Sequence, residues 1–171
     1  ARDPWQLGGR GLRMLRTDLF NAPQSPPLPP RQRVVTAVLA GRLGRWSPVR
    51  ALWSLWYPSE ARAAFDALEV FSLGDRLWSR VDRLSGGERQ RVGLARGLVA
   101  QARALLVDEP LVALDPALAD QTVRALTGHC ETTQATLICS LHQVDMALAH
   151  FPRVIRLREG RILFDRRPDQ I

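Results

Sequence analysis

The sequence predicts an α/β protein with a mainly parallel sheet, joined to a small helical subdomain. Short apolar runs at residues 104–107 and 136–140 indicate two buried strands. A helix is expected between them over 116–127, because Asp115 can cap it and Pro116 suits its first position. Strand, helix and strand in this order are typical of a parallel sheet with helices on its faces.

The residues before this pattern predict mostly helices. Residues 12–20 favour a strand or a short helix. Five prolines between residues 22 and 30 predict an extended loop, because proline lacks the backbone donor that helices and central strands need. Residues 34–43 predict an apolar helix that ends at Gly44, and a second helix is expected from Ser59 to about residue 70.

The rest of the chain predicts two further helices and a hairpin. The helices are expected at residues 85–99 and 144–150. The hairpin joins residues 154–157 to 161–164 through a Glu-Gly turn. No internal repeat is present, so these elements predict one domain and not an array.

Composition excludes several classes of protein. Hydrophobic residues make up 46% of the 171 residues, and no apolar run approaches the roughly 20 residues of a membrane-spanning helix. The net charge is +7 and every basic residue is arginine, spread along the chain. This spread favours the coding bias of a GC-rich genome over a nucleic-acid-binding arm. Cys130 and Cys139 lack metal-ligand spacing and fit buried thiols in a reducing cytosol.

Aromatic residues gather between residues 45 and 58, at Trp46, Trp53, Trp56 and Tyr57. Such a cluster fits two interpretations. The side chains form part of a core, or they form a surface that docks a partner.

The strongest chemical signal lies at residues 84–91, which read LSGGERQR. Ser85 can cap a helix and Glu88 can reach back to it, which makes a capping box. Gly86 and Gly87 allow close approach to a helix N-terminus that attracts anions. A capping box alone is usually only a cap, but the full string resembles the signature motif of the ATP-binding-cassette family.

Two adjacent carboxylates, Asp108 and Glu109, end the first predicted strand in the string LLVDEP. Neighbouring carboxylates repel unless they share a cation or a proton, which favours a divalent metal. Taken alone, the pair also fits a solvated loop. Beside the signature string it resembles the Walker B motif of the same family. That resemblance implies that Asp108 faces Mg²⁺ on ATP and that Glu109 polarises the attacking water.

Two further motifs follow in the order that the family keeps. The string ALDP at residues 113–116 resembles the D-loop, which implies that Asp115 lies at a dimer interface. A lone histidine is more often structural, but His142 occupies the place of the family's switch histidine, which contacts the γ-phosphate. The chain is therefore identified as a member of the ATP-binding-cassette family. The resemblance implies an ABC-type nucleotide-binding domain, P-loop NTPase-like, that lacks its N-terminal portion and carries a helical subdomain.

The resemblance also implies three parts and a missing element. Residues 1–30 would be a remnant of the N-terminal lobe with the proline-rich loop. Residues 31–100 would form a helical subdomain with the signature motif, and residues 101–171 the C-terminal part of the catalytic α/β core. A chain without lysine cannot contain the family's phosphate-binding loop, Gly-x-x-x-x-Gly-Lys-Ser/Thr. We therefore expect weak ATP binding, negligible hydrolysis by the isolated chain, and bare apolar sheet surface where the phosphate-loop strand would lie beside strand 104–107. Aligning residues 19–21 with the family's Q-loop strand places Asp18 at or near the Q-loop glutamine.

Three strings narrow the resemblance to the ATPases of phosphonate importers: TAVLAGRLG, SLHQVD and GRILFD, at residues 36–44, 140–145 and 160–165. The implied cofactors are ATP and Mg²⁺. The nucleotide of a second, identical subunit would be contacted by Ser85, Gly86, Gly87 and Glu88. The other implied partners are an integral membrane permease and, indirectly, a periplasmic solute-binding protein, at the cytoplasmic face of the bacterial inner membrane, without nucleic acid.

Other functions stay open at this point. The missing phosphate loop and Asp18 favour a degenerate or regulatory fragment without catalysis. The charge of +7 is the only feature that suggests a soluble cassette ATPase acting on DNA. Phosphate, phosphite or another small oxyanion would suit the importer almost as well as phosphonate.

Overall fold

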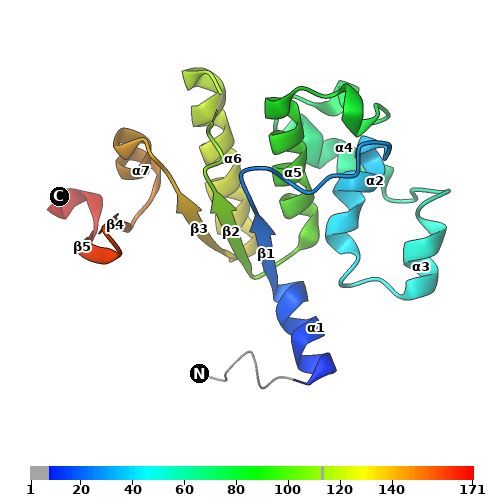
Figure 1. The fold of residues 1–171 in the computed structure, drawn as a ribbon, viewed down its shortest axis with the longest axis horizontal. Coiled ribbons are helices and arrows are strands. Elements are labelled where there is room, and N and C mark those ends of the chain that lie inside the picture. The colour runs from blue at the N-terminus through cyan, green and yellow to red at the C-terminus, as the bar shows by residue number, and fades with distance from the viewer. Residues whose placement is uncertain (1–7, 113) are drawn as a thin grey trace.

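A parallel sheet lies at the centre of the protein. The computed structural model describes residues 8–112 and 114–171. Strands β1 (Leu19–Ala22), β2 (Ala104–Asp108) and β3 (Thr136–Ser140) are all parallel, with β2 in the middle (Figure 1). Strands β4 (Val154–Arg158) and β5 (Arg161–Arg166) form a separate antiparallel hairpin. The predicted α/β fold class is confirmed.

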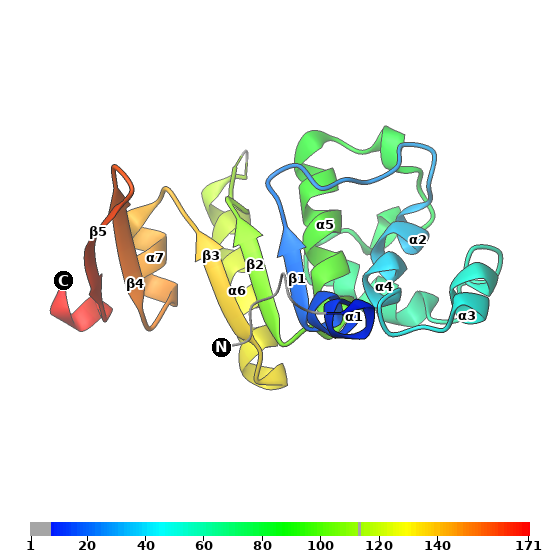
Figure 2. The ribbon, with the colours of Figure 1, turned by 60° about the horizontal axis from the view of Figure 1, so that its bottom comes forward.

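Seven α-helices lie in the described part of the chain: α1 (Gly9–Asp18), α2 (Val34–Leu39), α3 (Pro48–Trp53), α4 (Ala61–Glu69), α5 (Gly86–Ala100), α6 (Pro116–Thr133) and α7 (Val144–His150). Figure 2 shows α2, α3 and α4 gathered beyond α5, on the side of β1, with α7 and the hairpin at the opposite end. Among the described residues, no helix is both long and apolar enough to cross a membrane.

The segment before the proline-rich loop combines the two structures that the sequence left open. Helix α1 ends at Asp18 and strand β1 follows at once with Leu19. Residues 23–29 then contain no regular helix or strand, as the prolines predict.

Helix α6 is capped as predicted but is longer than expected. Asp115 accepts a hydrogen bond from the backbone N–H of Leu118 at 3.0 Å, and Pro116 occupies the first turn. The helix continues to Thr133 and stops where Gln134 adopts a left-handed conformation with φ 56°. The predicted end near residue 127 was therefore too early.

The predicted helix at residues 34–43 is shorter than expected, because it tightens where it meets α5. Helix α2 ends at Leu39 and a 3₁₀ turn follows over Ala40–Arg42. A Cβ atom on Gly41 would lie 2.3 Å from the carbonyl oxygen of Arg96 in α5. Only glycine allows the two backbones to come this close.

Two arginines, one at the end of this turn and one shortly after it, cap the end of α5. Arg42 donates to the carbonyl of Val99 at 3.3 Å, and Arg45 donates to the carbonyls of Ala100 and Gln101 at 3.3 and 2.5 Å. Cationic side chains at a helix C-terminus satisfy carbonyls that have no partner within the helix.

One hydrophobic core extends from the helices to the sheet. Phe71, Leu68 and Val92 are fully buried in the same cluster as Leu105 of β2 and Leu126 of α6. The core is therefore continuous across residue 100, where we expected a boundary between subdomains. The division of the chain into three parts stays a prediction.

The expectation of a bare edge on β2 is wrong. β2 pairs with β1 on one side and with β3 on the other, so the edge strands of the described sheet are β1 and β3. Exposed apolar side chains lie instead on β3, where Ile138 is 59% exposed, and on the hairpin, where Leu157 and Ile162 are exposed.

Replacing Gly41 with alanine is expected to lower the free energy of unfolding by about 1–3 kcal/mol, the usual range for overpacking. The added methyl group would collide with backbone of α5, which has little freedom to move. Urea denaturation measures the change. Gly128→Ala in α6 is the matched control, because no atom lies within 4 Å of its new Cβ. Equal stability of the two variants would contradict this account of the α2–α5 contact.

Candidate nucleotide and catalytic site

The three parallel strands bring their carboxyl ends to one edge of the sheet. Gln24 follows β1, Asp108 and Glu109 end β2, and His142 follows β3. An open depression of about 230 Å³ lies at this edge, and Glu109, Leu111 and His142 are among the residues that line it. Ligands of open parallel α/β sheets bind outside the carboxyl ends of the strands, so this is the candidate site.

Glu109 is the centre of the polar contacts at this edge. Its Oε1 lies 2.6 Å from Nε2 of His142, and its Oε2 accepts a hydrogen bond from the side-chain amide of Gln24 at 3.1 Å. His142 is otherwise open, with 78% of its side chain exposed. The structure thus brings the two predicted catalytic residues into direct contact.

The placement of Asp18 at the Q-loop position is wrong. Asp18 is the last residue of α1, at the opposite end of β1, where its carboxylate lies 3.9 Å from Arg45. Gln24 is the residue that reaches the site, since its amide contacts Glu109. The expectation placed the Q-loop position before strand β1, whereas the residue that contacts Glu109 lies after this strand. The signal that it missed is the glutamine two residues after strand β1, within the proline-rich stretch.

Asp108 is held at the end of β2 by the neighbouring strand. The Ser140 hydroxyl donates to Oδ1 of Asp108 at 2.6 Å. Burial, with a contribution from the charge of Asp108, raises the pKa of the nearby Cys139 thiol to about 12. Cys139 therefore stays protonated near neutral pH and is not a nucleophile.

The residues present fit a magnesium ion that takes most of its ligands from water and from substrate phosphate oxygens. Within residues 8–112 and 114–171, no cluster of three or more His, Cys, Asp or Glu side chains is placed to hold a metal. Mg²⁺ keeps several waters and commonly takes one protein carboxylate together with substrate phosphate oxygens. Asp108, exposed at the strand end, suits that role.

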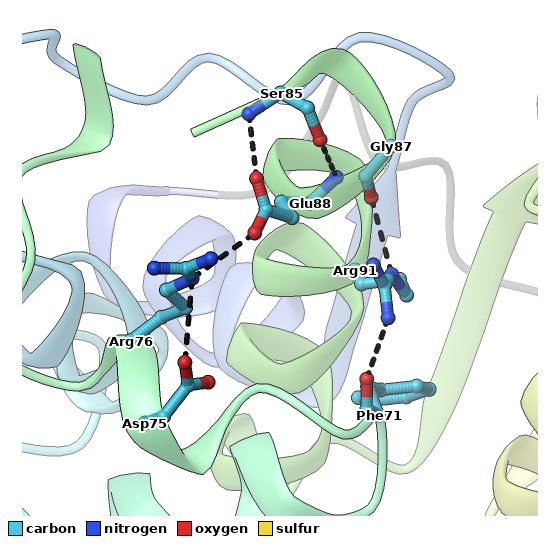
Figure 3. Close-up of polar contacts among 7 residues, drawn as sticks. All are labelled: Phe71, Asp75, Arg76, Ser85, Gly87, Glu88 and Arg91. Atoms are coloured by element: carbon cyan, nitrogen blue, oxygen red, sulfur yellow. Dashed lines mark hydrogen bonds and ion pairs between the residues drawn. The ribbon is translucent and has the colours of Figure 1, made fainter. Parts of the chain in front are cut away.

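The LSGGERQR string forms the N-terminus of α5, and its capping box is present (Figure 3). The Ser85 hydroxyl accepts from the N–H of Glu88 at 3.2 Å, and Glu88 accepts from the N–H of Ser85 at 2.7 Å. The hydrogen bond from the Ser85 backbone is the largest factor that lowers the pKa of Glu88, and Arg76, at 3.1 Å, acts in the same direction. Arg91 also donates to the carbonyl of Phe71 at 2.8 Å, which ties the helix to the preceding loop.

The predicted residues fall into two groups within one chain. Ser85 and Glu88 make their side-chain contacts with each other and with Arg76, whereas Glu109 contacts His142 and Gln24. Asp115 is engaged in the cap of α6, and Ala113 of the ALDP string lies outside the described residues. No hydrogen bond or ion pair between the two groups is found in the described part of the protein.

Comparison with solved structures identifies the fold. The structure of cbiO1 from Clostridium perfringens, part of the ABC transporter complex cbiONQ, matches 95% of this chain and 62% of its own with a TM-score of 0.75 at 22% identity. A dimeric post-hydrolysis ATP-binding cassette bound to ADP and Pi also matches with a TM-score of 0.75, at 21% identity over 95% of this chain and 68% of its own. The fold is that of an ABC ATPase domain.

Sequence comparison defines the family. Residues 4–112 match the sequence family described as ABC transporter. The phosphonates import ATP-binding protein PhnC 2 of Albidiferax ferrireducens is 58% identical over 96% of this chain, and the PhnC of Polaromonas sp. is 58% identical over the same share. The PhnC of Pseudomonas putida is 52% identical. The chain belongs to the ABC transporter family and spans about 60% of the length of these relatives.

Replacing Glu88 with alanine is expected to lower the free energy of unfolding by about 1 kcal/mol at pH 7, the scale of a hydrogen bond within a cap. Because the pKa of Glu88 is lowered in the folded state, its contribution is fully present above the ordinary glutamate pKa of about 4.3. It is lost as the pH falls through the lower folded-state pKa. Urea denaturation between pH 7 and pH 3 should therefore show the difference from the unmodified chain shrinking. Glu131→Ala, on the exposed face of α6, is the control; a pH-independent effect at Glu88 would refute the assignment.

Proposed function

We propose that this chain forms the larger part of the ATP-hydrolysing subunit of an importer for phosphonate or a similar small oxyanion. The observation that carries the proposal is the contact of Glu109 with His142 and Gln24 at the carboxyl end of the parallel sheet. The names of the relatives, phosphonates import ATP-binding proteins, support the choice of solute.

In this proposal each residue of the sheet edge has one task. Glu109 accepts a hydrogen bond from the attacking water, which polarises the water and orients it toward the γ-phosphate. His142, open to solvent except for Glu109, contacts that phosphate. Asp108 would help to hold a Mg²⁺ ion, which would offset the negative charge of the phosphates. The Q-loop role that the sequence suggested for Asp18 is proposed here for Gln24, whose side chain contacts Glu109.

The signature helix serves a second nucleotide. The N-terminus of α5 presents Ser85, Gly86 and Gly87 with the positive end of a helix dipole, which suits a γ-phosphate. In the part of the chain that the structure describes, none of them forms a hydrogen bond with Glu109, which supports a role for them and Glu88 across a dimer of identical subunits. Asp115, at the start of α6, would lie at that interface.

ATP turnover tests the catalytic assignment. In the full-length gene product, Glu109→Gln is expected to lower the turnover of ATP by about 100-fold or more, since the amide cannot act as a base. Its affinity for ATP should change little, because the carboxylate acts on water and not on the nucleotide. The matched control is Glu131→Gln in α6. Normal turnover by Glu109→Gln would refute the proposal.

The 171 residues contain no lysine and so no phosphate-binding loop, and we expect the isolated chain to hydrolyse ATP negligibly. Turnover by the isolated chain that Glu109→Gln abolishes would contradict that expectation while supporting the role of Glu109.

An exposed apolar patch supports the proposed contact with a permease. Trp46, one of the four clustered aromatics, is buried under the guanidinium of Arg50, which lies 5.1 Å from its ring. The side chains of the α3 patch, in contrast, are all between 56% and 79% exposed: Val49, Leu52, Trp53, Leu55, Trp56 and Tyr57. The core interpretation therefore applies to Trp46, and the exposed residues remain available for the docking interpretation. An apolar patch of this kind suits a cytoplasmic helix of a membrane protein.

Replacing Trp53 and Trp56 together with serine is expected to lower recovery of the permease with the ATPase by about tenfold or more, because buried tryptophans dominate interface energies. Co-purification from detergent-solubilised membranes measures this. The control is Trp78→Ser, which changes an exposed tryptophan outside the α3 patch. Unchanged recovery with the double variant would remove the α3 patch from the interface.

A further inference from the structure

The backbone of Glu109 adopts an unusual conformation. Its φ is 47°, in the left-handed region that is uncommon for residues with a Cβ atom. The next residue is Pro110, whose ring disfavours the right-handed helical region at Glu109. Left-handed residues of this kind persist at functional sites when the surrounding structure holds them there.

Two side chains hold the peptide groups on either side of Glu109. The N–H of Glu109 donates to the Ser140 hydroxyl at 3.0 Å. The carbonyl of Glu109 accepts from the side-chain amide of Gln90 at 2.8 Å. A rotation of Glu109 into an extended conformation would break both hydrogen bonds.

The two supporting side chains are themselves restrained. The single proton of the Ser140 hydroxyl goes to Asp108 at 2.6 Å, so its lone pairs remain for the N–H of Glu109. The parallel register of β2 and β3 pairs Asp108 with Ser140 and sets this arrangement. Gln90 lies in α5 and is only 7% exposed, so its amide donor would be costly to leave without a partner.

The held backbone determines where the carboxylate lies. With φ at 47°, the side chain of Glu109 reaches both His142 and Gln24. We propose that Ser140 and Gln90 are positioning residues, which keep Glu109 in its left-handed conformation and so set the place of its carboxylate. This inference rests on the proposed role of Glu109 in activating water.

The test measures kcat and KM for ATP in the full-length gene product. Ser140→Ala removes the acceptor for the N–H of Glu109, and Gln90→Leu removes the donor at similar volume. Each is expected to lower kcat by roughly 10- to 100-fold, because a displacement of about 1 Å at a reacting group has an effect of that order. KM for ATP should stay within about twofold, since neither side chain binds the nucleotide.

Conservative and control variants separate positioning from general damage. Ser140→Thr keeps the hydroxyl and should retain kcat within about threefold. Gln121→Leu is the matched control for Gln90, because the exposed amide of Gln121 also donates to a backbone carbonyl, that of Val70 at 3.2 Å, away from the site. It should leave kcat unchanged. Among the described residues, no hydrogen bond joins Gln90 to Asp108, so its variant also separates the effect from the loss of the Ser140–Asp108 hydrogen bond.

A double-mutant cycle with Glu109→Gln shows whether Ser140 and Gln90 act through Glu109 or independently of it. If Ser140 and Gln90 act through Glu109, their variants cause no further loss of single-turnover rate in the Glu109→Gln background. Additive losses, or full kcat in both single variants, would overturn the inference while leaving Glu109 catalytic. Normal turnover by Glu109→Gln itself would instead refute the proposed function.

Discussion

The parallel register between β2 and β3 is the constraint on which the site depends. It places Asp108 directly beside Ser140, so one hydroxyl reaches both the carboxylate of Asp108 and the N–H of Glu109. The loop that follows β3 then returns His142 to Glu109. A shift of one residue in this register would turn every side chain of β3 to the other face of the sheet and separate these groups.

Helix α5 connects the signature motif to the backbone of Glu109. Its first turn carries the capping box of Ser85 and Glu88, and its second turn carries Gln90, which is hydrogen-bonded to the backbone of Glu109. Its last carbonyls are capped by Arg42 and Arg45. One helix therefore bears both the capping box and a hydrogen bond to the backbone of Glu109.

The site was predicted in part because its motifs are local in sequence. The capping box depends only on Ser85 and Glu88, three residues apart, and Asp115 caps α6 in the same way. Gln24 was missed because its role is defined by a contact with Glu109, 85 residues away. Proline-rich loops carry no periodic pattern, so nothing local marked where such a glutamine would lie.

Sequence alone determined the order of the elements after residue 84 and the chemical types of the residues at the sheet edge, because apolar periodicity and capping depend on neighbours along the chain. The α/β class, the capping box and the adjacent carboxylates all followed from such patterns. Only the tertiary structure decided which of Trp46 and Trp53 is buried, where α2 must tighten against α5, and how Glu109 is aimed. Those outcomes depend on packing and hydrogen bonds between segments that are distant in sequence, and no local pattern records them.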